Sequence, residues 1–232
     1  MLWVELVEQL FGEDHEVQAW GDFLQGAARL DGATMAVVGS TNHAPVGFDM
    51  ALRQARVVLD TMALHPGRPI LLLIDTQGQQ LRRRDELLGI NRAMAHLGCC
   101  IDLARRRGHR VVGLVYDQAL SGGFLTSGLI ADACYALPEA EIRVMRIPAM
   151  ARVTKISEDR LTALSQRNPV FAPGVRNYLL MGGVRGLWEG DLKDCLRQAL
   201  RDSPRADERA HDGLVRGGRL HAHPVAQRVL AA

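Results

Sequence analysis

The sequence has few cysteines and no long uninterrupted apolar run. Its 232 residues include four cysteines with no C-x-x-C pair and no histidine at metal-ligand spacing, which argues against a disulfide framework and against a zinc site. No apolar segment approaches the length of a membrane span, and acidic residues interrupt the N-terminal stretch that could otherwise resemble a leader. We therefore expect a cytoplasmic protein with reduced thiols and no membrane association.

The chain also lacks a strong charge of either sign. Its 28 Lys and Arg against 26 Asp and Glu leave a net charge of +2, too little for a nucleic-acid footprint, and we expect no nucleic-acid partner. Two basic runs occur, at 82–84 and 105–107. Solvated helix faces are the favoured interpretation of both, and phosphate contact is the alternative.

Composition and pattern predict a globular α/β protein. Hydrophobic residues make up 47% and charged residues 23%, the balance of a chain with a full core. Continuous apolar runs predict strands separated by helices, which indicates a mostly parallel sheet covered on both faces. The expected strands are 34–38, 69–74, 110–115 and 134–137, and the expected helices are 48–64, 83–107, 122–130, 158–165 and 187–200, with a Pro- and Gly-bearing connection at 168–174.

The pattern changes at both ends of this region. Residues 1–32 carry apolar positions at helical spacing followed by a Gly-punctuated stretch, which predicts an N-terminal helical extension. Residues 203–232 carry Pro, Gly, Arg and His without clear periodicity, which predicts a flexible or partner-held tail. The main domain is therefore expected to span 33–202.

Three turns follow the expected strands, at Gly39–Ala44, Asp75–Gly78 and Ala119–Phe124. Functional groups of parallel sheets gather at the carboxyl ends of strands. The third turn is the most informative, because Gly122 and Gly123 come directly after a strand and directly before a helix. Glycines there let the backbone approach a ligand, and the N–H groups of a helix N-terminus favour an anion.

The same turn has two other interpretations. Gly122 and Gly123 could simply allow a helix to pack tightly against the sheet. Ser121 could be a nucleophile, but the sequence around it lacks G-x-S-x-G and shows no base, so this is the less favoured interpretation. Asp75 and Thr76 could cap the helix that follows.

Three segments in series resemble the carboxyl-terminal half of acyl-CoA carboxyltransferases. That family has an aliphatic strand ending in D-T-P-G, a G-G-A-Y turn and a W-P-x-A-E-I-x-V-M segment at matching separations. The corresponding segments here are 70–78, 119–124 and 137–145. Gln77 replaces the proline, and Phe124-Leu125 replaces Ala-Tyr. With these departures, the sequence looks like the gamma subunit of biotin-independent malonate decarboxylase.

The resemblance implies a crotonase/ClpP-like superhelix of ββα units. It also implies an active site shared with a beta subunit, a malonyl substrate on the thiol of an acyl-carrier subunit, and an alpha subunit that transfers the acyl carrier. A phosphopantetheine-type thiol on the carrier would serve as the substrate arm. We expect no cofactor or metal in this chain, and no biotin.

By transfer from the family, the backbone N–H groups of Gly123 and Phe124 form an oxyanion hole, with Gly122 supporting the turn. They could hold the enolate or the departing carboxylate. Tyr116, Tyr135 and His43 are candidates for the proton donor or for substrate contact, because they lie near strand ends.

Three other functions compete with malonyl-thioester decarboxylation. The first is a carboxyl-terminal carboxyltransferase subunit of a biotin-dependent acyl-CoA carboxylase or decarboxylase. The second is a non-catalytic scaffold that completes the fold of a partner. The third, a stand-alone enoyl-CoA hydratase or isomerase, would require activity from this chain alone.

Overall fold

One twisted sheet organises the fold. The structure, a computed structural model, describes residues 1–166, 174–204 and 206–232. Within them, eight strands form the sheet in the order β1-β2-β3-β4-β5-β6-β8, with β7 also pairing with β5. From β3 onward every pairing is parallel, whereas β1 and β2 are antiparallel. The strands are β1 Gln18–Trp20, β2 Phe23–Leu30, β3 Ala33–Ser40, β4 Ile70–Thr76, β5 Val111–Leu120, β6 Ala133–Ala136, β7 Glu141–Arg143 and β8 Gly186–Leu187.

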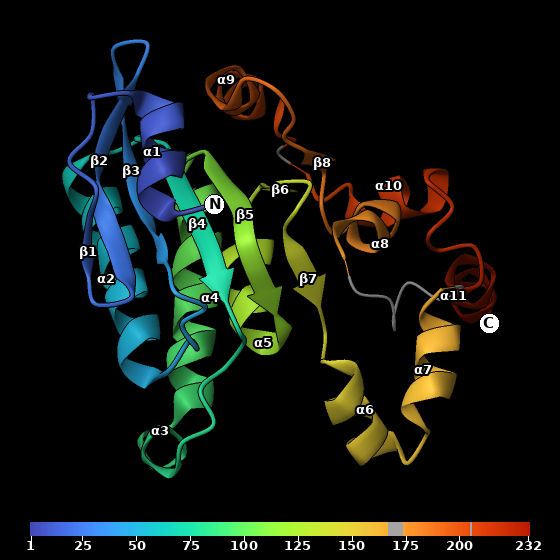
Figure 1. The fold of residues 1–232 in the computed structure, drawn as a ribbon. Coiled ribbons are helices and arrows are strands. Elements are labelled where there is room, and N and C mark those ends of the chain that lie inside the picture. The colour runs from blue at the N-terminus through green and yellow to red at the C-terminus, as the bar shows by residue number, and fades with distance from the viewer. Residues whose placement is uncertain (167–173, 205) are drawn as a thin grey trace.

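Helices cover both faces of the sheet (Figure 1). On one face pack α2 (Phe48–Leu64) and α4 (Ile90–Arg106), and on the other α1 (Trp3–Phe11) and α9 (Leu192–Asp202). Along β4, Ile70 and Leu72 join the first core and Leu71 and Leu73 the second. A strand buried on both sides has no polar face, which explains the continuous apolar run. The predicted α/β class with a mostly parallel sheet is confirmed.

The remaining helices connect the strands or follow the last of them. They are α3 Arg83–Leu88, α5 Ser121–Phe124, the π-helical turn η1 Leu125–Leu129, α6 Ile147–Thr154, α7 Glu158–Ser165, α8 Val175–Leu180, α10 Arg209–Val215 and α11 Ala222–Leu230. In the part of the chain that the structure describes, none of the helices has both the length and the apolarity to cross a bilayer.

The secondary structure expected for residues 1–32 needs correction. The helix forms only over Trp3–Phe11, and residues 18–30 form β1 and β2, which continue the sheet through β3. Pairing with β3 determines the structure of residues 18–30, because their local sequence pattern is weak. At Gly26 a Cβ would lie 2.4 Å from the Glu16 carbonyl oxygen, so the crossing chain requires a glycine in the strand. The division into 1–32, 33–202 and 203–232 itself stays a prediction.

Four other expected elements differ clearly in their bounds. The helix expected over 83–107 divides at Gly89, whose φ is 82°. The strand expected over 110–115 continues to Leu120, and the helix expected over 122–130 divides into α5 and η1. The helix expected over 187–200 begins only after Asp191, whose side chain accepts the Asp194 N–H. The expected connection at 168–174 lies, apart from Gly174, outside the described residues.

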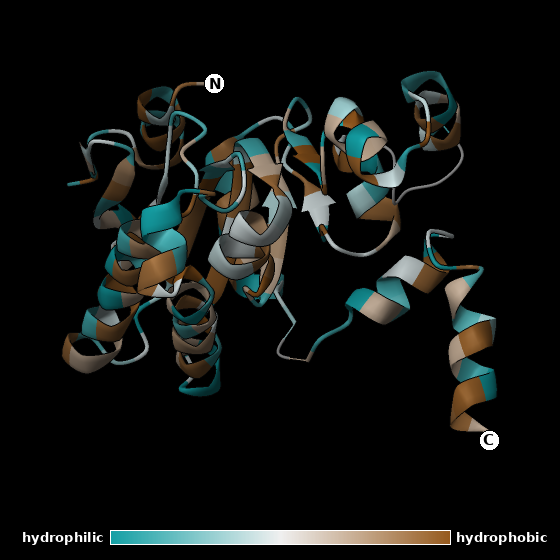
Figure 2. Ribbon diagram, turned by 90° about the horizontal axis from the view of Figure 1, so that it is seen from below, coloured by the Kyte–Doolittle hydropathy of each residue, from teal (hydrophilic) through white to brown (hydrophobic). Residues whose placement is uncertain are grey.

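In the described residues of the expected tail, 203–204 and 206–232, two helices form. Contacts with α8 and the segment after it hold the end of α10 in place, because Arg216, which follows α10, donates to the Leu179 and Val184 carbonyls at 3.0 Å each. Every residue of α11 is exposed, and the C-terminal helix stands clear of the sheet in Figure 2. Residues 209–215 are therefore held in a defined position by contacts with distant residues of the chain. The local periodicity of the sequence does not indicate such contacts.

Candidate functional site

The turn after β5 is tightly constrained. Ser121 has a φ of 52°, a left-handed conformation that turns the chain sharply from β5 into α5. A Cβ on Gly123 would lie 2.6 Å from both the carbonyl carbon and the carbonyl oxygen of Gly78. No side chain fits at that distance. The glycine therefore serves close backbone approach, as the packing interpretation of the sequence required, at a helix N-terminus that also favours an anion.

The N–H groups of this turn differ in their partners. The Gly122 N–H donates to Gln79 Oε1 at 3.2 Å. Gly123 lies in the first turn of α5, where N–H groups have no acceptor within the helix. Phe124 is one position further, where a regular helix offers its N–H the carbonyl of Leu120. Of the two donors implied by the resemblance, the Gly123 N–H is therefore the better placed to meet a ligand.

The three turns expected at the carboxyl ends of the strands lie together. The Gln77 N–H donates to the His43 carbonyl at 3.3 Å, and the Val46 N–H donates to the Gly78 carbonyl at 2.8 Å. The buried Thr76 hydroxyl donates to the Ala44 carbonyl at 2.6 Å. Since Gly78 also backs Gly123, the loop after β3, the loop after β4 and the turn after β5 form one continuous surface at the sheet edge.

His43 stands on this surface between two carboxylates. Its Nε2 lies 3.6 Å from Asp75 Oδ1 and 3.3 Å from Asp117 Oδ2. The side chains of His43 and Asp117 are 49% and 44% exposed, whereas that of Asp75 is only 3% exposed. Burial raises the pKa of Asp75, against the opposing effects of the His43 and Gln118 N–H groups.

The two tyrosines are placed differently from His43. Tyr116 is 3% exposed and its hydroxyl donates to the Ser40 carbonyl at 2.9 Å. Burial raises the pKa of Tyr116 well above its ordinary value. The ring of Tyr135 packs on Trp188 with centroids 5.4 Å apart, in the core beneath α1 and α9. Both positions favour structural roles. The structure therefore brings only His43 of the three to the surface beside the glycine turn.

Sequence reasoning missed Gln79 and Asp117 as parts of this surface. Gln79 follows the D-T-Q-G segment directly, so its position beside the turn could have been found from that motif. Asp117 lies within β5, four residues before Ser121, and only the pairing of β4 with β5 brings it beside Asp75. No signal in the sequence marks that contact.

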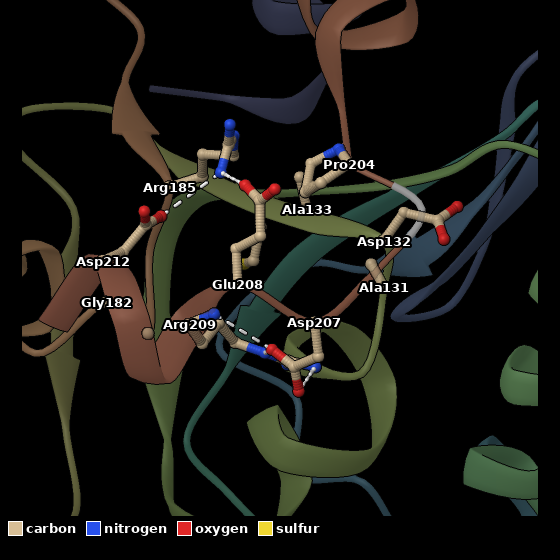
Figure 3. Close-up of a pocket in the computed structure, with 12 residues that line it drawn as sticks. Ala131, Asp132, Ala133, Gly182, Arg185, Pro204, Asp207, Glu208, Arg209 and Asp212 are labelled. Carbon is tan, nitrogen blue, oxygen red and sulfur yellow. Dashed lines mark hydrogen bonds and ion pairs between the residues drawn. The ribbon is translucent and has the colours of Figure 1, made fainter.

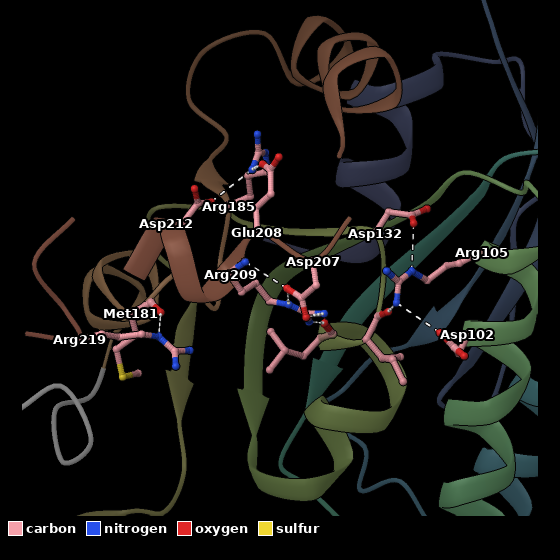
Figure 4. A network of polar contacts seen from close by, with 12 residues as sticks. Asp102, Arg105, Asp132, Met181, Arg185, Asp207, Glu208, Arg209, Asp212 and Arg219 are labelled. Atoms are coloured by element: carbon pink, nitrogen blue, oxygen red, sulfur yellow. Dashed lines mark hydrogen bonds and ion pairs between the residues drawn. The ribbon is translucent and has the colours of Figure 1, made fainter. Parts of the chain in front are cut away.

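A pocket between β6, the segment before β8, and α10 has a different character (Figure 3). Its charged side chains pair within the chain: Arg185 contacts Glu208 at 2.9 Å and Asp212 at 3.2 Å, and Arg209 contacts Asp207 at 2.8 Å. Figure 4 shows the same network extending to Arg105, which binds Asp132 at 3.0 Å. The Arg185 contacts fasten α10 to the segment before β8, and the Arg105 pair joins α4 to the residue before β6, so these contacts are structural.

Comparison with known proteins gives one family match. The model of the family described as malonate decarboxylase gamma subunit matches residues 41–232. A curated relative, a malonyl-S-ACP:biotin-protein carboxyltransferase of Malonomonas rubra, is 35% identical over 154 residues. That match covers 63% of this chain and 53% of the relative, so the chain aligns with about half of the relative's length.

Solved structures extend the likeness over nearly the whole chain. A Pseudomonas malonate decarboxylase hetero-tetramer in complex with coenzyme A has a TM-score of 0.78 and 26% identity, covering 97% of both chains. The hetero-dimer of MdcD and MdcE from the same enzyme also scores 0.78, with 26% identity over 97% of this chain and 96% of that one. The transcarboxylase 12S core, at 21% identity, scores 0.72 over 85% of this chain and 41% of that chain, and shares the fold.

Proposed function

Because the chain belongs to the malonate decarboxylase gamma-subunit family, we propose that it acts with a beta subunit to decarboxylate a malonyl thioester. The thioester is carried on the thiol of an acyl-carrier subunit, and the products are CO2 and the acetyl thioester. Family membership confirms the resemblance found in the sequence. The glycine turn Ser121–Phe124, placed where the ends of β3, β4 and β5 meet, is the observation that supports the activity most directly.

Oxyanion stabilisation is the chemistry that this turn can supply. Loss of CO2 from a malonyl thioester leaves an enolate, so negative charge on oxygen grows in the transition state. A backbone donor aimed at such an oxygen is worth about 3–4 kcal/mol of barrier. We assign that donor to Gly123, with Phe124 as the second and Gly122 supporting the turn through its bond to Gln79.

The enolate carbon must then take up a proton. Among the three candidates from the sequence, His43 is the one that is both half-exposed and on the same surface as the turn. In the described part of the chain, its Nδ1 has no hydrogen-bond partner. We therefore place His43 at the substrate side of the site as the proton donor. The alternative is a proton donor from the beta subunit.

The partners follow from the relatives. The similar Pseudomonas structures are a hetero-dimer of MdcD and MdcE and a hetero-tetramer. By analogy, this chain pairs with a beta subunit, and an acyl-carrier subunit with its alpha-subunit transferase presents the malonyl group on a phosphopantetheine-type thiol. The reaction needs no biotin, because CO2 is released and not passed on. The proposed compartment is the cytoplasm.

One observation favours a second function. The Malonomonas rubra relative transfers the carboxyl group of malonyl-S-ACP to a biotin protein. A carboxyltransferase subunit of that kind would use the same turn and the same thioester, and would differ only in the fate of the carboxyl group.

Avidin separates the two functions. The test measures malonate-dependent CO2 release from the chain reconstituted with its beta and carrier subunits, with and without avidin. We expect turnover that requires both partners and is insensitive to avidin. Turnover that stops when avidin is added would favour the biotin-dependent carboxyltransferase. Turnover by this chain alone would contradict the shared active site.

A further inference from the structure

Three potential ligand atoms converge at the carboxyl ends of β3, β4 and β5. His43 Nε2, Asp75 Oδ1 and Asp117 Oδ2 all lie within 4.8 Å of one another. The imidazole nitrogen is 3.6 Å and 3.3 Å from the two carboxylate oxygens, and the ring N–H makes a hydrogen bond with neither. The three groups therefore lie around a common position, and the imidazole makes no hydrogen bond with either carboxylate.

Asp75 gives an independent indication that something belongs at that point. Its side chain is 3% exposed, and Oδ2 accepts the His43 N–H at 2.8 Å. Its other oxygen, Oδ1, is buried without any hydrogen-bond partner and is the atom that faces the His43 ring. Buried polar atoms are almost always paired, so an orphaned carboxylate oxygen calls for a missing partner, such as an ion.

The loop that carries His43 is held in an unusual conformation. Asn42 and His43 both have φ values in the left-handed region, 56° and 52°. Non-glycine residues seldom adopt it, and such backbones persist where the surroundings impose them, often at functional sites. Here Asp22 secures the loop, since its carboxylate accepts Asn42 Nδ2 at 3.0 Å and its carbonyl accepts the Thr41 N–H at 3.0 Å. His43 is thereby fixed opposite Asp75 before any ligand arrives.

We propose that His43, Asp75 and Asp117 bind one divalent transition-metal cation of the zinc class. In a tetrahedral site with bonds of about 2.0–2.1 Å, neighbouring ligand atoms are about 3.3–3.4 Å apart. The two imidazole–carboxylate distances, 3.3 Å and 3.6 Å, are close to that spacing, and the two carboxylate oxygens lie within 4.8 Å of each other. Two carboxylates balance the charge of the cation, and the imidazole favours zinc over magnesium or calcium. Asp75 Oδ1 then gains the partner it lacks.

The proposed site keeps a coordination position open. Three protein ligands leave the fourth position of a tetrahedral cation for water or for a ligand oxygen. Because His43 and Asp117 are half-exposed, that position lies on the surface shared with the Ser121–Phe124 turn. A carboxylate or thioester oxygen has the chemistry to fill it. Cation binding itself does not depend on the proposed decarboxylation, so the two can fail separately.

Calorimetric titration of the chelator-treated full chain with zinc chloride, and then with manganese chloride, tests the site. We expect one equivalent to bind in the wild type. The His43→Asn and Asp117→Asn variants should bind at least about 100-fold more weakly, since each loses a ligand. Asn tolerates the left-handed φ of position 43, so that variant should keep its fold, which circular dichroism checks. The double variant His221→Asn/His223→Asn removes an exposed histidine pair in and before α11 and should bind like the wild type.

X-ray absorption of the zinc-loaded chain gives a second readout that is independent of activity. It should show one imidazole nitrogen together with carboxylate oxygens at about 2.0–2.1 Å. No stoichiometric binding, binding that His43→Asn leaves unchanged, or binding that the α11 double variant abolishes would each overturn the site. Loss of cation binding in both ligand variants would support the cation site whether or not the reconstituted complex releases CO2, so calorimetry tests the site separately from the proposed decarboxylation.

Discussion

Replacement of Gly123 by alanine tests the glycine turn most sharply. The new Cβ would lie 2.6 Å from the carbonyl carbon and oxygen of Gly78, and 2.9 Å from its Cα. These are backbone atoms of a loop that is itself held by the Thr76 hydroxyl and the Val46 N–H. Neither side can yield by a simple side-chain rotation, so the turn and the loop after β4 must separate.

Two magnitudes follow from that separation. Overpacking of a closely packed site costs typically about 1–3 kcal/mol of unfolding free energy. Displacement of one oxyanion donor lowers turnover by about 10²–10³-fold. We therefore expect Gly123→Ala to lower the unfolding free energy by about 1–3 kcal/mol. We also expect it to lower turnover by about 10²–10³-fold. Urea unfolding followed by circular dichroism measures the first quantity, and CO2 release by the reconstituted complex measures the second.

Gly98 provides the matched control. It lies inside α4, and a Cβ there would meet only Ile130 Cδ1 at 3.7 Å, an ordinary contact. Gly98→Ala should therefore gain about 0.5–1 kcal/mol from helix propensity and leave turnover unchanged. If Gly123→Ala has the same unfolding free energy and the same rate of CO2 release as Gly98→Ala, the close approach to Gly78 has no consequence and the reasoning is refuted. A folded Gly123→Ala complex with normal turnover would favour the scaffold function.

Two further predictions concern buried polar groups. Asp85→Ala should lower the unfolding free energy by about 1–3 kcal/mol in urea titrations, because the buried carboxylate accepts the Phe48 N–H at 2.9 Å and pairs with Arg82. Burial opposes ionisation of Asp85, but those two contacts lower its pKa below the ordinary 3.8. This stabilisation should be present above pH 3.8 and disappear as the pH falls through the lower folded value, and equal acid unfolding of wild type and Asp85→Ala would contradict it. Burial raises the pKa of Cys134 to about 12, so at pH 8 a thiol reagent should label the exposed Cys99 quickly and Cys134 only after unfolding. Rapid labelling of Cys134 in the native protein would contradict its burial.

The sequence by itself determined the fold class, the family and the order of the main elements. The helix Phe48–Leu64 was predicted to the residue, because its apolar spacing and the His65-Pro66-Gly67 stop are local signals. The run from Ile70 was recognisable as a doubly buried strand for the same reason, since burial of both faces removes every polar position. The glycines at 122 and 123 were found from their place between strand and helix. Their roles in catalysis stay predictions.

Only the tertiary structure decided which groups meet. Residues 18–30 are strands because β3 offers a pairing edge, and that energy comes from residues outside any local window. His43, Asp75 and Asp117 lie on three different strand ends, and parallel register brings them within 4.8 Å of one another. The unpaired oxygen of Asp75 has no counterpart in the sequence pattern. Local interactions choose the elements, whereas the sites arise from contacts between residues far apart in the chain, which no periodicity records.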